Sequence, residues 1–231
     1  PFPAGQATDI LARVMADRYP GRGRFMAHAV NAGVSAARNS LVARARGRYL
    51  WFVDPDDLVM PGALPELVDI LRRHAPDIVI CDYSKNGRQH VPAFAGTALT
   101  LERDREALVR GVFQERRMHL WLKISRRELW DEQLRFPVGR VFEDVAVTPY
   151  LLLRASSYFY VPRPWIVYRS RPGSILTSVR GGRFDARKHD DFIHALTGLK
   201  EEIAIRLPDA HAETRFRIAY FIAKEFTKVG Y

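Results

Sequence analysis

Apolar residues in the first half of the chain form short runs that alternate with amphipathic segments. The short runs predict strands at residues 24–30, 49–53 and 77–83. Apolar residues spaced three or four positions apart predict helices at residues 8–19, at residues 36–46 and from Pro61 onward. Strands that alternate with helices in this way are typical of an α/β protein with a parallel sheet.

The second half of the chain has a less regular pattern. It predicts helices at residues 103–115, 126–131 and 143–154, and Pro149 requires a kink or a break in the last of these. Strands are expected at residues 158–161 and 165–169, with one or two short strands within residues 88–101. From Phe184 onward the pattern is helical, and Pro208 separates two helices. We therefore expect a domain of residues 1–183 followed by a C-terminal helical appendage of residues 184–231.

The composition is that of an ordinary folded protein. The 231 residues are 47% hydrophobic and 27% charged, which excludes an intrinsically disordered chain. The single cysteine, Cys81, excludes an internal disulfide and a cysteine-rich zinc site, and it fits a reducing, cytoplasmic setting. The longest stretch without a charged residue or His, residues 91–101, is too short to span a membrane.

The chain carries a net charge of +10, and 30 of its 36 basic residues are arginine. Arginine suits the recognition of phosphate groups. Between Arg154 and Lys188 there are eight basic residues and one acidic residue, so most of the excess charge is local. The charge alone does not choose among nucleic acid, anionic lipid and phosphorylated small molecules. Because no nucleic-acid-binding motif accompanies it, we expect no nucleic-acid partner.

Three carboxylates follow the predicted strand at residues 49–53. Asp54, Asp56 and Asp57 would repel one another unless a cation neutralised them. Ligands of open α/β sheets bind at the carboxyl ends of the strands, and oxygen ligands select Mg²⁺ or Mn²⁺. The cluster therefore indicates a metal site. An acidic turn that caps the helix after Pro61 is the alternative interpretation.

Two ordered groups of residues resemble the signature of the family 2 glycosyltransferases, which are inverting enzymes of the GT-A fold. The first group is Asn31-x-Gly33-x-Ser35-x-Ala37-Arg38-Asn39, followed by Gly47-x-Tyr49-Leu50-x-Phe52-Val53-Asp54-x-Asp56-Asp57. The second is Trp121-x-Lys123-Ile124, then Arg135-Phe136-Pro137-x-Gly139-Arg140-x-Phe142-Glu143-Asp144, then Tyr168-Arg169-x-Arg171-x-Gly173-Ser174-Ile175. The resemblance implies an α/β, Rossmann-like nucleotide-diphospho-sugar transferase fold with a mostly parallel central sheet.

The resemblance also assigns a donor site. It makes Asp56 the direct ligand of Mn²⁺ or Mg²⁺ and places Asp54 at the metal and the nucleotide. Six further residues are implied to bind the donor or its diphosphate, and the basic side chains among them would neutralise the leaving group. They are Asn31, Gly33, Arg38, Arg169, Arg171 and Ser174. A solvent-exposed position on the helix surface is the alternative for Arg38.

On the acceptor side, the resemblance points to Glu143 and Asp144 at the start of a helix. A glycosyl transfer needs a base that takes the proton of the acceptor hydroxyl, and we assign Asp144 to this role and Glu143 to a sugar-hydroxyl contact. A simple charge complement to the helix N-terminus is the alternative. Lys123 is a candidate for an acceptor or phosphate contact, and Trp121 for sugar stacking or, equally, for core packing.

Together these features predict a metal-dependent transferase that uses a nucleotide sugar, preferably a UDP-sugar, as donor. The expected acceptor is a saccharide, a polyol phosphate or a lipid-linked sugar of a cell-surface polysaccharide, teichoic-acid-like polymer or glycolipid. Residues 1–100 would form the nucleotide and metal half, and residues 101–183 the acceptor half. A non-catalytic, truncated or degenerate module is the alternative, because we expect the chain to lack the family's first β-α-β unit.

The last predicted helix, residues 212–229, has an apolar face wider than one packing stripe, among basic residues. Three partners of this apolar face remain open: the catalytic domain, a second copy of the chain and a membrane surface. We expect a cytoplasmic protein that can also lie peripherally at the inner face of the cell membrane.

Overall fold

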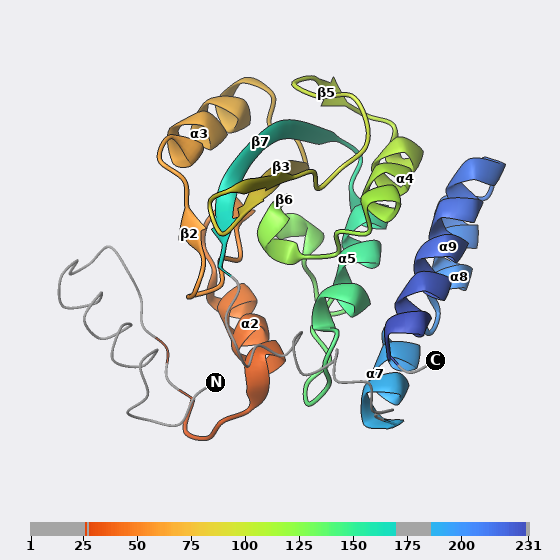
Figure 1. Ribbon diagram of the computed structural model, residues 1–231. Coiled ribbons are helices and arrows are strands. Elements are labelled where there is room, and N and C mark those ends of the chain that lie inside the picture. Colours follow the sequence, from red (N-terminus) through yellow and green to blue (C-terminus); the bar gives the residue numbers. More distant parts are fainter. Residues whose placement is uncertain (1–25, 27, 170–185, 230–231) are drawn as a thin grey trace.

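A strand that is buried along almost its whole length lies at the centre of the fold. The computed structural model describes residues 26, 28–169 and 186–229 (Figure 1). In strand β3 (Ile78–Lys85), every residue from Ile78 to Ser84 is buried. Strand β3 pairs with β7 (Tyr158–Tyr168) on one side and with β6 (Lys123–Arg126) on the other. The apolar run of the sequence thus forms a buried strand, as predicted, and the structure places it in the middle of the sheet.

Short strands complete the sheet, whose main order is β1-β6-β3-β7-β2. Strands β1 (Tyr49–Leu50) and β2 (Leu58–Val59) lie at its two ends. Strand β4 (Gln89–Val91) pairs with β3, and β5 (Leu101–Glu102) pairs with β7.

The sheet is mixed, which corrects the predicted mostly parallel sheet. Among the pairings within the described residues, β3 with β7 is parallel and the others are antiparallel. The prediction failed because β6 lies between β1 and β3, which follow one another in the α/β pattern of the sequence. Strands β1 and β3 nevertheless run in the same direction, since each is antiparallel to β6. The carboxyl ends of β1, β3 and β7 therefore meet at one edge of the sheet.

Strand β7 is continuous where the sequence predicted two strands. The chain passes through Pro162-Arg163-Pro164 without leaving the sheet, because the register to β3 shifts there. Cys81 pairs with Val161, but the next residue of β3, Asp82, pairs with Pro164. Such a bulge places extra residues on one strand and accommodates prolines, which cannot donate a hydrogen bond to the ladder.

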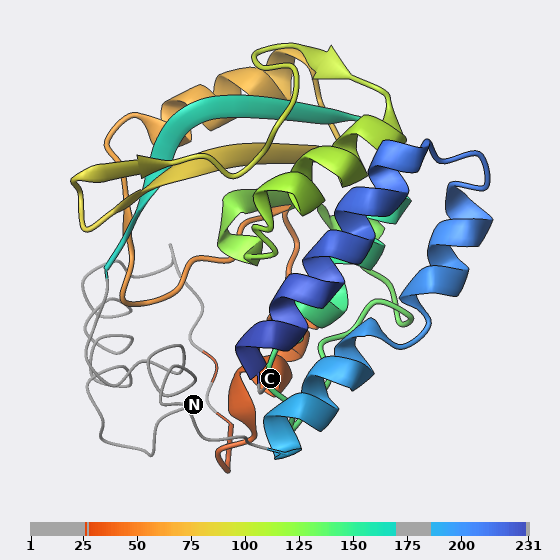
Figure 2. The same cartoon turned by 45° about the vertical axis from the view of Figure 1, so that its right-hand side comes forward.

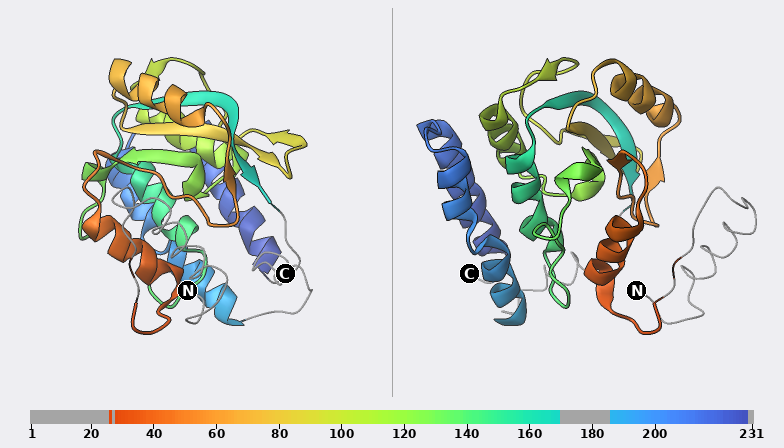
Figure 3. Two further views of the ribbon diagram at one scale, coloured as in Figure 1. Left: turned by 90° about the vertical axis from the view of Figure 1, so that its left-hand side faces the viewer. Right: turned by 180° about the vertical axis from the view of Figure 1, so that it is seen from behind.

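The helices form layers on the sheet. Figures 1 and 3 show α3 (Ala63–Arg73) on one side and α4 (Arg105–Glu115) and α5 (Glu143–Arg154) on the other. The C-terminal helices form an outer layer on the second side, where α9 packs on α4 and both α7 and α8 pack on α5 (Figure 2). These three helices are α7 (Ala186–Leu196), α8 (Leu199–Arg206) and α9 (Ala212–Val229). In the described part of the chain, no helix has the length and apolar character needed to cross a membrane.

Several predicted elements have different bounds in the structure. The predicted helix at residues 36–46 is α2 (Gly33–Arg44), and α5 has the predicted bounds with Pro149 inside it. The predicted helix at residues 126–131 is wrong, because β6 extends to Arg126 and a 3₁₀ turn, Arg127–Leu129, follows. The predicted helix at residues 8–19 lies outside the described residues, as do residues 24, 25 and 27 of the predicted strand at 24–30. The described residues of that segment, 26 and 28–30, do not form a strand, so this part of the prediction is wrong.

Candidate active site

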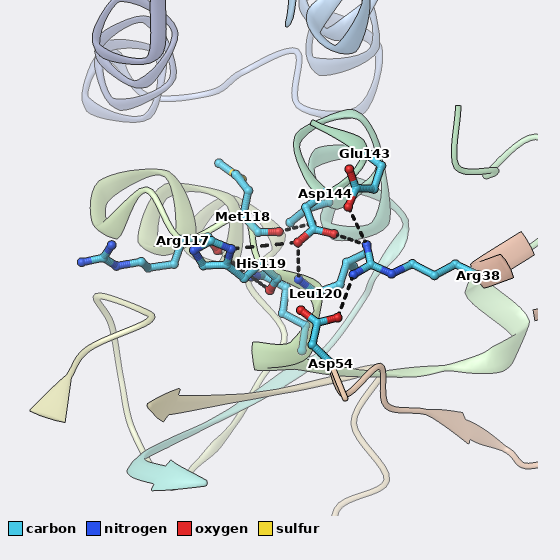
Figure 4. A network of polar contacts seen from close by, with 10 residues as sticks. Arg38, Asp54, Arg117, Met118, His119, Leu120, Glu143 and Asp144 are labelled. Carbon is cyan, nitrogen blue, oxygen red and sulfur yellow. Dashed lines mark hydrogen bonds and ion pairs between the residues drawn. The ribbon is translucent and has the colours of Figure 1, made fainter. Parts of the chain in front are cut away.

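The side chain of Arg38 joins three carboxylates from distant parts of the chain (Figure 4). Its Nη1 lies 2.7 Å from Oδ1 of Asp144 and 3.1 Å from Oε1 of Glu143. Its Nη2 lies 3.2 Å from Oδ1 of Asp54. Helix α2 supplies the arginine, the turn after β1 supplies Asp54, and the first turn of α5 supplies the other two acids. Three residues that the sequence assigned to one site therefore meet at a fourth, Arg38.

Arg38 is buried in this network, whereas its three carboxylate partners are partly exposed. Arg38 is 7% exposed, so the alternative interpretation, a solvent-exposed position on the helix surface, is wrong. Burial lowers the pKa of Arg38, but Asp144, Glu143 and Asp54 outweigh it and raise the pKa above its usual value. Burial also raises the pKa values of Asp54 and Glu143, and the charge of Arg38 opposes this shift. The guanidinium therefore favours the charged forms of these carboxylates, against the effect of burial.

Packing holds helix α2 and Arg38 in place. The guanidinium carbon of Arg38 lies 5.9 Å from the ring centre of Phe52 and 5.5 Å from that of Phe136. Asn39 donates to the carbonyl of Phe136 and accepts the N–H of the same residue, both at 2.9 Å. At the start of the helix, Gly33 adopts a φ of +87° and donates its N–H to Oδ1 of Asn31 at 3.2 Å. In this structure Asn31 and Gly33 shape the start of α2.

The segment between α4 and β6 approaches Asp144 from the other side. The N–H of Leu120 donates to Oδ2 of Asp144 at 3.4 Å, and Nδ1 of His119 lies 4.0 Å from the same oxygen. Thr148 of α5 donates to the carbonyl of Met118 at 2.6 Å. The imidazole of His119 therefore stands at the carboxylate that we expect to act as base.

The side chain of Lys123 is buried against the segment between α4 and β6. It is 1% exposed, and its Nζ donates to the carbonyls of Arg117 at 2.6 Å and His119 at 3.0 Å. Burial lowers the pKa of Lys123 to about 7. The structure thus shows the ammonium bound to backbone oxygens, where it fixes the segment that carries His119.

Trp121 lies in an aromatic cluster. It is 4% exposed, and its ring stacks with His119 at 5.0 Å and with Tyr168 at 6.0 Å between ring centres. Tyr83 contacts it edge-on at 5.1 Å, and Trp51 donates its ring N–H to the Trp121 carbonyl at 2.9 Å. Of the two roles that the sequence left open, these contacts are those of core packing.

The acidic turn after β1 also contacts the end of β7. Oδ1 of Asp57 accepts the N–H of Arg169 at 3.2 Å, and the side chain of Arg169 donates through Nε to the carbonyl of Asp56. Asp57 is 9% exposed, and burial raises its pKa to about 6. Asp57 therefore joins two neighbouring strand ends, while Arg169 lies beside the turn. Arg171 and Ser174 lie outside the described residues.

The donor atoms of this turn fit a divalent cation that also binds a ligand. Arg38 takes Oδ1 of Asp54, and no hydrogen bond joins Oδ2 of Asp54 or the carboxylate of Asp56 to another described residue. These are the hard oxygen ligands that Mg²⁺ and Mn²⁺ prefer. Within residues 28–169 and 186–229, no group of three or more His, Cys, Asp or Glu side chains could hold a metal. A cation here needs further oxygens from water or phosphate.

A cavity of about 560 Å³ lies at a different place, near the amino ends of β3 and β7. Its lining includes Asp77, Arg126 and Arg154, and it shares no residue with the Arg38 network. Arg126 is already paired with Asp77 at 3.1 Å, and Arg154 with Asp131 at 2.8 Å. Because these charges are satisfied within the protein, we place the candidate site at the carboxyl edge of the sheet.

Sequence reasoning found the acids of this site and missed part of their surroundings. His119 lies two residues before Trp121 in a group that was otherwise recognised, so its position beside the motif was the available signal. Asp191 of α7, which contacts the turn before Glu143, carries no comparable signal because it lies in the C-terminal helical segment.

Comparisons with known proteins agree on one family and one fold. The family model described as "Glycosyl transferase family 2" matches residues 6–122. The uncharacterized glycosyltransferase EpsJ of Bacillus subtilis is 29% identical over 160 residues, which are 64% of this chain and 45% of that protein. The minor teichoic acid biosynthesis protein GgaB of the same organism is 37% identical over 73 residues, 32% of this chain and 8% of that protein. The chain thus spans less than half of these two relatives.

A solved structure supports the fold. The crystal structure of S. aureus TarS 1-349 in complex with UDP-GlcNAc superposes with a TM-score of 0.68 at 20% sequence identity. The match covers 96% of this chain and 61% of the TarS chain. The predicted α/β GT-A fold is therefore confirmed, with a mixed sheet in place of a mostly parallel one.

The buried ammonium of Lys123 predicts how stability depends on pH. Its pKa is about 7 in the folded chain and near 10.5 when unfolded, so between these values the unfolded state binds more protons. The free energy of unfolding of the wild type should therefore rise with pH in this window, relative to Lys123→Met. Urea denaturation of both proteins at about pH 6.5 and about pH 9.5 measures the difference. Lys200→Met, at an exposed position of α8, is the control, and a pH-independent difference would contradict the prediction.

Proposed function

The chain belongs to glycosyltransferase family 2, and on this premise we propose that it transfers a sugar from a nucleoside diphosphate sugar to an acceptor hydroxyl, with inversion. The observation that carries the proposal is the Arg38 network. It brings Asp54, at the donor end of the site, within reach of the same guanidinium as Asp144, the proposed base. A sugar held between the two carboxylates would have its leaving group on one side and the incoming hydroxyl on the other.

Asp144 is suited to act as the base because its two oxygens differ. Oδ1 is held at 2.7 Å by Arg38, while Oδ2 faces His119 and receives only a long hydrogen bond from Leu120. Oδ2 would take the proton of the acceptor hydroxyl while that oxygen attacks the anomeric carbon. The bond from this carbon to the diphosphate oxygen breaks on the opposite face, which inverts the configuration. Glu143, also held by Arg38, would contact a sugar hydroxyl.

The donor end would hold the nucleoside diphosphate, preferably of uridine. Asp56 and the remaining oxygen of Asp54 would bind Mn²⁺ or Mg²⁺, which when bound neutralises charge on the diphosphate. Arg169 lies against the same turn, so its positive charge is near the expected phosphates. Arg171 and Ser174 follow it in the sequence and are proposed to contact the same group. The complex of TarS with UDP-GlcNAc, a protein of the same fold, supports a UDP-sugar as donor.

We propose a cell-surface polymer or glycolipid as acceptor, with a saccharide, polyol phosphate or lipid-linked sugar at its growing end. The relationship to GgaB, a teichoic acid biosynthesis protein, supports this class. The basic excess between Arg154 and Lys188 also favours a phosphate-bearing substrate. Lys123 and Trp121 would act on such an acceptor indirectly, because their contacts fix His119 beside Asp144.

The outer face of α9 supports a further contact, with an anionic membrane surface. Phe216 and Tyr220 are 59% and 41% exposed, and their rings stack at 5.9 Å. The cations of Arg116, Arg217 and Lys224 each lie within about 6 Å of one of these rings. Exposed aromatic rings among basic side chains are typical of helices that lie in the lipid headgroup region. We therefore propose peripheral binding at the inner face of the cell membrane.

The assignment of the base predicts the effect of Asp144→Asn. Sugar transfer should fall by about 10²- to 10⁴-fold, since the amide cannot take the proton. Binding of UDP with Mn²⁺, measured by calorimetry, should change little because the donor end is intact. UDP release from UDP-sugars, with polyol phosphates and lipid-linked sugars as acceptors, measures transfer. Asp69→Asn on α3 is the control. Unchanged turnover would refute the base, and nucleotide binding without any turnover by the wild type would favour a non-catalytic module.

The proposed metal ligands predict how UDP binding responds to chelation. Replacing Mn²⁺ by EDTA should weaken UDP binding to the wild type by about tenfold or more, equivalent to at least about 1.4 kcal/mol. Asp56→Asn should bind UDP in Mn²⁺ about as weakly as the wild type does in EDTA. Glu201→Gln, on α8, serves as control and should behave like the wild type. Calorimetric titrations that show the same affinity with Mn²⁺ and with EDTA would contradict the assignment.

The proposed membrane contact predicts that the chain sediments with vesicles containing phosphatidylglycerol more than with pure phosphatidylcholine vesicles. The double variant Phe216→Ser/Tyr220→Ser should lose most of this binding, whereas Leu64→Ser, an exposed apolar residue of α3, should retain it. Equal binding to both kinds of vesicle would argue against the contact. Self-association in analytical ultracentrifugation that the double variant abolishes would instead identify a second copy of the chain as the partner.

A further inference from the structure

The backbone turn that presents the two acids of α5 is strained. Phe142, directly before Glu143 and Asp144, has a φ of +63° and no side chain caps the helix there. A bulky residue in the left-handed region is an outlier and costs on the order of 1–3 kcal/mol. Such a conformation persists only when surrounding contacts hold it. The position of Asp144 therefore depends on what fixes the turn before it.

Helix α7 of the C-terminal segment makes those contacts. Oδ2 of Asp191 accepts the N–H of Val141 at 3.0 Å, and Oδ1 accepts from Nη1 of Arg140 at 2.9 Å. The ring of Phe142 lies edge-on to that of Phe192, with 5.4 Å between ring centres. Arg187 also donates to the carbonyl of Gly139 at 3.2 Å. Side chains of two successive turns of α7 thus hold the turn at residues 139–142.

Phe192 links this turn to the last helix. Its ring is 1% exposed and lies edge-on to Phe226 of α9 at 4.9 Å. The C-terminal helices are therefore packed against the candidate site through α7, although the sequence suggested an appendage beside it.

We propose that Asp191 is a positioning residue, which holds the turn at residues 139–142 so that α5 presents Glu143 and Asp144 to Arg38. Its carboxylate is 5% exposed, so its desolvation is offset by the charged hydrogen bond of Arg140 and the backbone N–H of Val141. Neither contact reaches substrate. Because a displacement of about 1 Å at a reacting group can cost about 10²-fold in rate, a loosened turn would reduce transfer without removing a catalytic atom.

The neighbouring residue provides a matched control. Asp190 also binds Nη1 of Arg140 at 2.9 Å, but its side chain is 72% exposed and bonds no backbone group of the turn among the described residues. An exposed ion pair contributes about 0–1 kcal/mol. Asp190→Asn and Asp191→Asn each remove one negative charge that binds Arg140. Only Asp191→Asn also alters the contact with the N–H of Val141.

The catalytic part of this inference rests on the proposed transferase activity. In Asp191→Asn, kcat for transfer should fall about 10- to 100-fold while KM for the donor and the calorimetric affinity for UDP change less than about twofold. Asp190→Asn should transfer like the wild type. Leu199→Ala, a buried substitution on α8 that does not touch the turn, controls for a general loss of stability. An equal fall of kcat in Leu199→Ala at a similar melting temperature would overturn the proposal.

Hydrogen exchange tests the positioning contact without turnover. The amides of Val141 and of Ala146, which bonds the Phe142 carbonyl at 3.0 Å, should exchange faster in Asp191→Asn than in the wild type and in Asp190→Asn. Unchanged exchange at both amides, or unchanged kcat in Asp191→Asn, would refute the positioning role. A wild-type chain that transfers no sugar would refute the proposed function instead, and the exchange rates would then decide whether Asp191 holds the turn.

Discussion

Three carboxylates can lie together in a half-buried site only if a cation lies among them, and in this protein that cation is Arg38. Its two terminal nitrogens contact acids from opposite sides of the site, Asp54 from the turn after β1 and Asp144 from the start of α5. Removing the charge would leave like charges in a poorly solvated place, at a cost typical of breaking a buried ion pair, about 3–5 kcal/mol. Helix α2, the acidic turn after β1 and the start of α5 are all joined by this one side chain.

The sheet makes the network possible by aligning strand ends. Strands β1, β3 and β7 run in the same direction although β6 separates the first two, so the residues that follow β1 and β7 meet at one edge. Asp57 and Arg169 contact each other there. On the helical side, α5 ends close to the start of β7, and its first turn lies at that same edge. The residues of the candidate site therefore lie at the carboxyl edge of the sheet, where β1 and β7 end and α5 begins.

The sequence predicted the elements whose pattern is local. Strand β3 was found because its apolar residues form a short continuous run, and the acids of the candidate site were assigned through their resemblance to a known family. The 3₁₀ turn at Arg127–Leu129 was missed because pairing of β6 with β3 overrides its helical pattern. The continuity of β7 was missed because the prolines suggest a break and only the register to β3 accommodates them. The contacts of His119 and Asp191 come from packing between distant segments, which no local pattern encodes.

The sharing of Arg38 by the two ends of the site has a thermodynamic consequence. Its guanidinium divides its hydrogen bonds between Asp54 and the pair formed by Glu143 and Asp144. A ligand that moved Asp54 away from the guanidinium would change the electrostatic potential at Asp144. A ligand at Asp144 would change the potential at Asp54, again through Arg38. Linkage requires such an effect to be equal in both directions, so a ligand bound at Asp54 and a ligand bound at Asp144 would change each other's affinity by the same factor through Arg38.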